Sequence, residues 1–403
     1  MKWETYKLKQ LCSEIVDCVN KTAPTSDVPT PYKMLRTSDI RDGKINLENL
    51  NCVTKEVYEK WTRRGKLQKG DVIFTREAPL GEVGLVREEK NYFLGQRLVL
   101  FRANNKMCDG RFLMYSLLWH DNKQAIISKG VGSTVAHLRV PECENIEIKA
   151  PDLDIQHRIA DILSAYDDLI ENNQKQIKLL EEAAQRLYKE WFVDLRFPGH
   201  ENAKIVDGVP EGWNWCKLED AIQFDPKVTL TKERMKQFVP MSALSTSSMV
   251  LDESQFTETT SNSGSKFQNG DTLLARITPC LENGKTAYVS GLESDEGTVG
   301  STEYIVMRAK TINAYMVYLL ARTDDFRQSA INSMSGSDGR QRVKSDKLKM
   351  LDYLHPTGEL VEKFEKVAGP IFEKICKLSK QMQRAKQARD FLLPKLMSGE
   401  VEV

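Results

Sequence analysis

Histidine and cysteine are the residues of this sequence best suited to metal binding, nucleophilic catalysis and proton transfer. The five histidines, at positions 120, 137, 157, 200 and 355, do not stand at metal-ligand spacings. The eight cysteines form no C-x-x-C pair, which favours free thiols in a reducing compartment over a zinc site or a disulfide framework. No Ser-His-Asp or Cys-His set is recognisable. We therefore predict no metal site and no catalytic residue in this chain.

Glycine-rich loops that hold phosphates or cofactors are also missing. There is no G-x-x-x-x-G-K-[ST] loop, and no glycine-rich loop accompanied by the N/D-P-P-Y tetrapeptide of an adenine or cytosine methyltransferase. The string "GVGSTV" at 130–135 is a weak candidate, but its counterpart "MSGSDG" at 334–339 lacks the first glycine, so a flexible turn is the better interpretation. We expect no cofactor in this chain.

The sequence instead repeats itself after about 200 residues. "LQKGDVIFTR" at 67–76 returns as "FQNGDTLLAR" at 267–276, and "KWETYKL" at 2–8 returns as "GWNWCKL" at 212–218. The matched Gly70 and Gly270 predict turns with positive φ. Asp71 and Asp271 are expected to accept turn N–H groups. The repeat predicts two similar β-rich units, each followed by a long helical segment.

Both helical segments carry an apolar stripe with the same steps of 4-3-4-4-3-4-3-4-3-4, which predicts an antiparallel coiled-coil seam between them. The predicted seam residues are Ile155, Ile159, Ile162, Tyr166, Ile170, Asn173, Ile177, Leu180, Ala184, Leu187 and Trp191, and then Leu360, Phe364, Val367, Ile371, Ile375, Leu378, Met382, Ala385, Arg389, Leu392 and Leu396. The polar members Asn173 and Arg389 are expected to fix the register. Pro370 should kink the second helix unless the helix begins after it. The alternative is that each helix packs only on its own domain.

Composition places the chain among multidomain globular proteins. Its 403 residues exceed what one core usually organises, and 40% are hydrophobic and 29% charged. No apolar run is long enough to span a bilayer and the first residues lack a signal-peptide core, so we expect a cytoplasmic protein without a membrane partner. The net charge of +1 hides an asymmetry, because residues 1–150 carry 25 Lys and Arg against 19 Asp and Glu. Such an imbalance does not by itself indicate a nucleic-acid partner.

The arrangement of these segments resembles the specificity subunit of type I restriction–modification systems over essentially the whole chain. The resemblance rests on the two G-D-x-x-x-x-R strands, on "IADILSAYDDLIENN" at 159–173 followed by "LRFPG", and on the closing "ARDFLLPKLMSGEVEV" at 388–403. It implies an α+β fold in which two similar α/β target-recognition domains are separated by two long helices that form an antiparallel coiled coil. The expected segments are recognition domains at 1–152 and 199–355 and helical regions at 153–198 and 356–403.

The resemblance also implies a function. Each recognition domain would read one half of a bipartite double-stranded DNA target, and the helices would set the gap. Two modification subunits would dock on the helices and bring S-adenosylmethionine for adenine methylation, and motor/nuclease subunits would cut unmodified DNA. This chain would be the non-catalytic subunit.

Base readout needs side chains that hydrogen-bond to base edges, and the loops after the repeated strands are the expected sites. The predicted contacts are Arg36, Thr75, Arg76, Arg97, Lys129, Ser133, Thr134, His137 and Arg139 in the first domain, and Arg276, Thr278, Lys285, Ser301, Thr302, Ser337, Arg340, Gln341 and Arg342 in the second. Arg76 and Arg276 recur at one offset, which favours a shared phosphate contact or structural salt bridge over base readout. The segment "SDGRQR" at 337–342 is the strongest candidate, with a solvated turn as its alternative.

Two rival functions stay open on the sequence alone. An enzyme that methylates or cleaves DNA itself is disfavoured by the missing motifs. A coiled-coil scaffold that binds only proteins predicts no sequence-dependent affinity for DNA.

Overall fold

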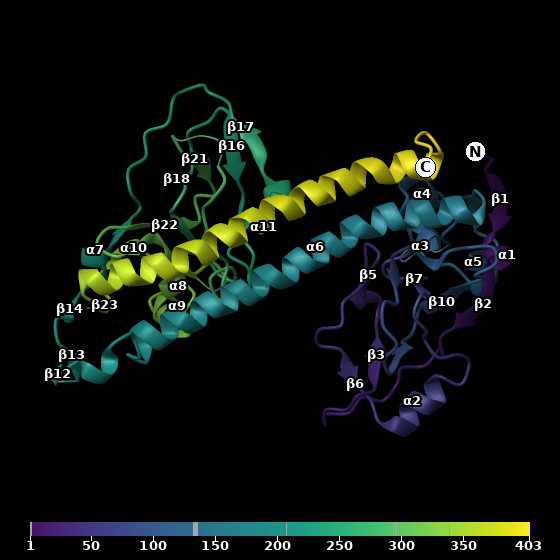
Figure 1. Cartoon of the computed structure of the whole chain (residues 1–403), viewed down its shortest axis with the longest axis horizontal. Helices are drawn as coiled ribbons and strands as arrows, with labels where there is room; N and C mark the ends of the chain where they lie inside the picture. Colours follow the sequence, from purple (N-terminus) through teal and green to yellow (C-terminus); the bar gives the residue numbers. More distant parts are fainter. Residues whose placement is uncertain (1, 132–135, 207, 293, 295, 338) are drawn as a thin grey trace. The chain divides into compact units, whose positions relative to one another are not determined.

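The computed structural model describes residues 2–131, 136–206, 208–292, 294, 296–337 and 339–403. Contacts divide the chain into two compact units, the first made of Met1–Ile170 with Arg384–Val403 and the second of Glu171–Gln383. Each unit joins a β-rich part to stretches of two long helices, α6 (Leu153–Tyr188) and α11 (Gly358–Ser398) (Figure 1). The four predicted segments assign each helix to a region of its own, and their boundaries stay a prediction.

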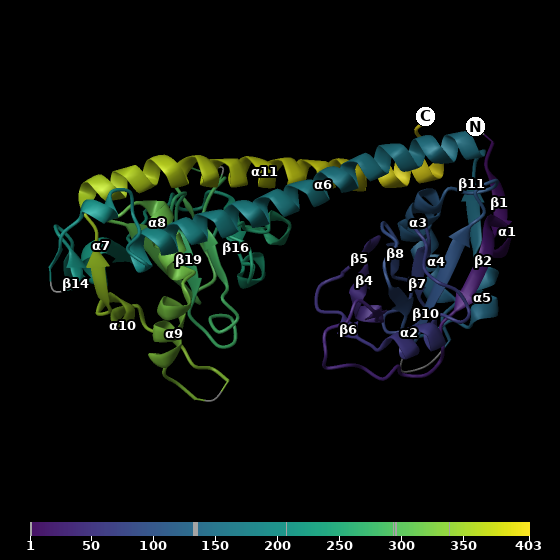
Figure 2. The same cartoon turned by 60° about the horizontal axis from the view of Figure 1, so that its bottom comes forward.

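The first unit is built around a four-stranded antiparallel sheet in the order β2-β10-β7-β8. A smaller sheet, β6-β3-β9, pairs β3 and β9 in parallel. Helix α3 lies between the larger sheet and α6, and all three contribute to one core (Figure 2). The elements before α6 are β1 Glu4–Lys7, α1 Leu8–Leu11, β2 Cys12–Asp17, β3 Lys33–Leu35, β4 Ile40–Arg41, β5 Lys44–Ile45, β6 Asn51–Cys52, α2 Lys55–Trp61, β7 Val72–Thr75, β8 Val83–Leu85, β9 Tyr92–Leu94, β10 Leu98–Ala103, α3 Gly110–Leu118, α4 His120–Ser128, α5 Val140–Glu144 and β11 Glu147–Ala150.

The second unit repeats this plan, which confirms the predicted internal repeat. Its main sheet has the equivalent antiparallel order β15-β22-β19-β20, and its smaller sheet, β17-β16-β21-β18, again contains one parallel pair, β16 with β21. The elements between α6 and α11 are β12 Ile205–Val206, β13 Val209–Pro210, β14 Asn214–Lys217, α7 Leu218–Ala221, β15 Ile222–Phe224, β16 Lys236–Val239, β17 Thr257–Thr259, β18 Ser265–Phe267, β19 Thr272–Ala275, β20 Thr286–Tyr288, β21 Thr298–Gly300, β22 Tyr304–Ala309, α8 Ala314–Ala321, α9 Asp324–Asn332, α10 Ser345–Lys349 and β23 Asp352–His355.

The repeated sequence segments form the same turn and ion pair in both units. Gly70 and Gly270 have φ angles of 92° and 90°, a conformation that favours glycine. The carboxylates of Asp71 and Asp271 each accept the backbone N–H three residues earlier, at 2.7 and 2.8 Å. Each also accepts hydrogen bonds from an arginine of the neighbouring strand, which is Arg102 on β10 and Arg308 on β22. Because both aspartates are buried, the arginine supplies the charge that their burial requires.

The two long helices pack against each other within each unit, and the contacts run in opposite chain directions. In the first unit, Ile159 of α6 shares a core with Leu396 of α11. In the second unit, the rings of Tyr188 and Phe364 lie 6.1 Å apart. The predicted polar seam residues also join the helices, because the Asn173 amide donates to the carbonyl of Leu378 and to the Gln381 side chain, and Arg389 pairs with Asp167.

The structure excludes one alternative left open for Pro370 and overturns one prediction about the second helix. The helix does not begin after Pro370, since α11 starts at Gly358 and continues through the proline. Proline has no backbone N–H, so the carbonyl four residues before Pro370 has no helical hydrogen-bond donor. Pro370 lies on the exposed face of the helix, and water can supply that hydrogen bond. Val367 was predicted in the seam but is 45% exposed, whereas its neighbour Ala368 and also Phe372 are buried. At this end α11 packs on the β-rich part as well as on α6, so its buried face turns away from the regular seam.

Candidate nucleic-acid interface

Four described stretches of the first unit meet where β7 ends, and we name residues 76–81, 95–97, 129–131 and 136–139 the first loop cluster. The backbone N–H of Arg76 donates to the carbonyl of Arg97 at 2.8 Å, and the N–H of Leu138 donates to the carbonyl of Arg76 at 3.0 Å. Val131 and His137 exchange two backbone hydrogen bonds of 3.0 Å. Predicted contact residues that are distant in sequence are thereby brought together.

The second unit has a matching second loop cluster, formed by residues 276–285, 301–303, 333–337 and 339–342. The Arg276 N–H donates to the carbonyl of Glu303 at 3.0 Å, and Ser335 and Arg342 exchange backbone hydrogen bonds of 3.0 and 2.9 Å. The Thr278 N–H donates to the carbonyl of Gln341 at 3.1 Å. The two clusters therefore share a backbone plan while their side chains differ.

Arg76 and Arg276 contact the protein's own backbone at equivalent places. The Arg76 guanidinium donates to the carbonyl of Leu138 at 3.3 Å and pairs with Asp17 at 3.1 Å. Arg276 donates from Nε to the carbonyl of Val343 at 3.2 Å. These contacts favour the structural interpretation of the repeated arginine over base readout.

Thr75 is corrected by the structure. Its side chain is fully buried, and its hydroxyl donates to the carbonyl of Pro79 at 2.5 Å and accepts the N–H of Glu82 at 2.9 Å. A side chain enclosed in the core and already hydrogen-bonded on both sides cannot reach a base edge. Thr75 therefore leaves the set of candidate contacts.

Each loop cluster contains an arginine–glutamate pair, and the loop before the equivalent strand carries the arginine in the first cluster and the glutamate in the second. In the first cluster, Arg97, on the loop before β10, lies with its Nε 3.3 Å from a carboxylate oxygen of Glu77. In the second, the loop before β22 carries the acid, Glu303, and Arg342 donates to it from Nε and Nη2 at 2.7 to 3.0 Å. Hydrogen bonds from Arg342 hold the pKa of the Glu303 carboxyl below its usual range. One scaffold thus presents different charges at equivalent positions.

The other predicted contacts fall into four groups. Lys129, Arg139, Thr302, Ser337 and Arg340 are exposed within the clusters. His137, Thr278, Lys285, Ser301 and Gln341 are half-buried there, with Lys285 donating to the carbonyl of Met241 at 2.9 Å. Arg36 lies outside the clusters and pairs with Asp39 at 2.8 Å. Ser133 and Thr134 lie outside the residues that the structure describes.

Sequence reasoning missed the acids that hold these arginines and a buried network on the helices. Glu77 follows Arg76 directly, but only the fold brings it to Arg97. On α6, the carboxylate of Asp167 accepts the Tyr115 hydroxyl at 2.5 Å and Arg389 at 2.6 Å. An aspartate beside the apolar stripe gave no distinctive signal.

Among the described residues, no group of three histidine, cysteine or acidic side chains is arranged to hold a metal ion. None of the described helices combines the length and the apolar character that crossing a membrane requires.

The chain is similar in sequence to specificity subunits of type I restriction enzymes. The family model described as the type I restriction modification DNA specificity domain matches residues 1–182. The specificity subunit of the type I restriction enzyme MjaIX from Methanocaldococcus jannaschii is 26% identical over 348 residues, which cover 83% of this chain and 78% of that protein. The HindI specificity subunit from Haemophilus influenzae is 21% identical over 434 residues, which cover 91% and 94%.

A solved structure shares the fold. The crystal structure of a type I restriction-modification S subunit from M. genitalium matches with a TM-score of 0.63 at 16% identity, covering 98% of this chain and 96% of that chain. At this identity the likeness concerns the arrangement of elements and not the bases or partners recognised.

Proposed function

We propose that the chain is a DNA specificity subunit of a type I restriction–modification system and that it reads a split DNA target with its two loop clusters. Each cluster contacts one half of the target, and the base pairs between the halves are not read. The chain directs methylation and restriction that its partner subunits carry out, and it has no catalytic role of its own.

The observation that carries this proposal is one scaffold used twice with different side chains at its loops. The turn glycines, the buried aspartates and the backbone hydrogen bonds of Arg76 and Arg276 recur, which is what positioning of a loop requires. The pairs Arg97–Glu77 and Arg342–Glu303 differ in which segment carries the positive charge. Since arginine suits guanine and acids accept hydrogen bonds from cytosine, such differences would change the sequence read.

Long helices suit the role of a spacer between two reading sites. A helix advances about 1.5 Å per residue and its partner fixes its register, so helix length would set how many base pairs are left unread. The contacts of Asn173 and Arg389 with the facing helix support a fixed register, because a one-turn slip would break both. The gap length and the target bases follow from the assay below.

The catalytic chemistry is assigned to the partners. Two modification subunits dock on the helices and neighbouring surfaces, bind S-adenosylmethionine and methylate adenine. The target adenine must leave the base stack to reach such a site, and the partner holds the extruded base. Motor/nuclease subunits join this core to cut unmodified DNA. The chain then works in the cytoplasm, where the DNA is.

Single-molecule sequencing of methylated adenines tests the proposal. DNA is taken from a host that expresses this chain with its modification subunit, and a host with the modification subunit alone is the control. The expected result is one split motif with a fixed unread gap, present only when both chains are expressed. Absence of modified sites despite an assembled complex would favour the protein-binding scaffold. Methyl transfer by the purified chain alone would make it an enzyme and would refute the proposal.

A further inference from the structure

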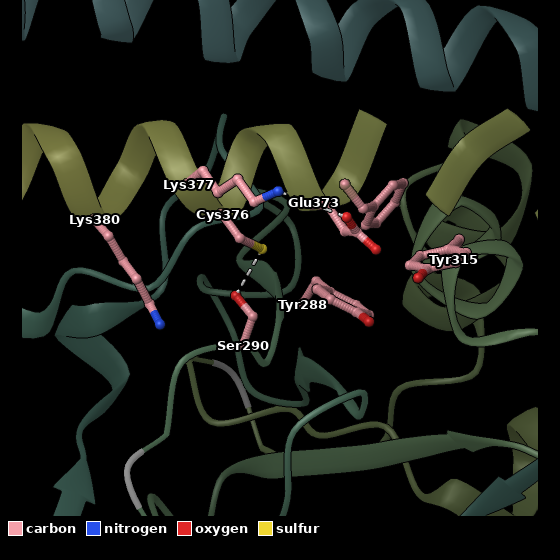
Figure 3. Close-up of a pocket in the computed structure, with 8 residues that line it drawn as sticks. Tyr288, Ser290, Tyr315, Glu373, Cys376, Lys377 and Lys380 are labelled. Atoms are coloured by element: carbon pink, nitrogen blue, oxygen red, sulfur yellow. Dashed lines mark hydrogen bonds and ion pairs between the residues drawn. The ribbon is translucent and has the colours of Figure 1, made fainter. Parts of the chain in front are cut away.

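A pocket of about 270 Å³ opens in the second unit between α11, β20 and the first turn of α8 (Figure 3). In Figure 3 the side chains of α11 face Tyr288 and Ser290 across the pocket. The lining residues are Tyr288, Ser290, Tyr315, Phe372, Glu373, Cys376, Lys377 and Lys380. No part of the proposed reading function uses this site.

Three aromatic rings form the apolar part of the pocket. The buried Phe372 ring lies 4.7 Å from the Tyr315 ring and 5.2 Å from the Tyr288 ring, between ring centroids. Beside them the Cys376 thiol donates to the Ser290 hydroxyl at 3.1 Å. Rings in mutual contact are held by their packing, so the pocket is formed before anything enters it.

The rim of the pocket is basic. Lys377 lies 3.8 Å from Glu373, so part of its charge is compensated. Lys380 is exposed, and within the part of the chain that the structure describes no carboxylate pairs with it. An acidic group on a bound partner would therefore find a cation at the edge of an aromatic pocket.

The equivalent place in the first unit is filled by polar groups. Phe372 corresponds to Asp167, which lies 205 positions earlier and accepts the hydroxyl of Tyr115. Its neighbour Asp168 pairs with Arg87 at 2.5 Å. The second unit thus has an aromatic pocket at the place where the first has a tyrosine–aspartate hydrogen bond and an ion pair.

The size of the pocket restricts its occupant. Pockets for drug-sized ligands measure about 300 to 1,000 Å³, so this one is small for a cofactor. Energetically dominant contacts between proteins, in contrast, are single large side chains that enter preformed aromatic pockets beside a polar rim. The geometry points to an anchoring pocket for one aromatic or large aliphatic side chain of the modification subunit, next to a carboxylate that pairs with Lys380. This assignment rests on the proposed function, which supplies the partner.

Binding of the full-length chain to the purified modification subunit tests the pocket. Ser290→Trp places a large ring in the pocket, and Lys380→Glu reverses the rim charge without touching the rings. Lys386→Glu is the matched control, because Lys386 is also exposed on α11, forms no ion pair among the described residues and lies on a different face of the helix. Thermal unfolding of each variant verifies that it is folded.

We expect Ser290→Trp and Lys380→Glu each to weaken binding at least about tenfold, and Lys386→Glu to leave it unchanged. Alkylation of Cys376 by iodoacetamide, followed by mass spectrometry, should be slower in the wild-type complex than in the free chain. Wild-type affinity in both pocket variants, or an equal loss in the control, would overturn the pocket while leaving the proposed function intact. Failure of the wild-type chain to bind the modification subunit would overturn the proposed partner and the pocket together.

Discussion

Replacing Arg389 by methionine should destabilise the helix pair of the first unit. The side chain of Asp167 is 8% exposed, and Arg389 Nη1 lies 2.6 Å from its carboxylate. Without the guanidinium, the hydroxyl of Tyr115 is the one donor left to this buried carboxylate among the residues that the structure describes. A buried charge that loses its counter-charge is costly, because the solvation given up on burial is no longer offset.

The size of the effect follows from burial. Removing one partner of a buried pair costs about 3 to 5 kcal/mol. Arg389 is still 17% exposed and Tyr115 still donates, so we expect about 3 kcal/mol, the lower end of that range. For a unit of this size the loss corresponds to a Tm lower by about 6 to 12 °C.

A double variant separates the cost of the orphaned charge from that of lost packing. Asp167→Leu combined with Arg389→Met should recover most of the stability, because an apolar pair of similar volume needs no counter-charge. The second unit supports this expectation, since Phe372 and Ala184 stand at the corresponding positions and are both buried there. The cycle is completed by Asp167→Leu alone.

Differential scanning calorimetry of the full chain measures these changes, and hydrogen exchange of amides in 384–398 identifies the transition of the first unit. Arg384→Met, at an exposed position on the same helix, is the control and should change stability by less than about 0.5 kcal/mol. The reasoning is refuted if Arg389→Met melts within about 1 °C of the wild type, or if the double variant is no more stable than the single one.

Three other outcomes are expected. Cys52 should be the thiol that iodoacetamide modifies first near neutral pH. A 2.9 Å hydrogen bond from Lys33 lowers the pKa of Cys52 and so raises its thiolate fraction. Mass spectrometry should therefore show slower labelling of Cys52 in the Lys33→Met variant. Arg342→Ala should lower the free energy of discrimination at one base pair of one half-site by about 1 to 3 kcal/mol. Methylation sequencing should then show a less specific base at that position and an unchanged second half-site. Insertion of one heptad in each long helix, beside Asn173 and the facing Leu378, should widen the unread gap by about three base pairs with the same bases read, and an unchanged gap would contradict the spacer role.

The sequence repeat predicted the local structure correctly where a residue type has a single local structural role. Gly70 and Gly270 were predicted as turn glycines because few other residues adopt positive φ, and both have it. Asp71 and Asp271 were predicted to accept turn N–H groups, and both do. Their arginine partners were missed, since pairing between neighbouring strands joins positions that sequence spacing does not relate.

The apolar stripes predicted the helix pair but not every residue of its interface. A stripe records which positions are buried, and it does not say against what. Val367 matches the regular spacing, yet at that end of α11 the β-rich part competes for the helix, and Phe372 turns toward Tyr315 instead. The same ambiguity hid Asp167, which is buried beside the seam because Tyr115 and Arg389 meet it there.

The sequence was enough to predict the duplicated unit, the long helices, the turn chemistry and the family resemblance, because these depend on local spacing and on segments repeated along one chain. The folded structure was needed to learn how each candidate side chain is held. It buried Thr75, committed Arg76 and Arg276 to backbone carbonyls and joined Arg342 to Glu303. It also left an aromatic pocket in one unit where the other has ion pairs. Burial and pairing depend on segments that are far apart in the chain, so no local pattern contains them.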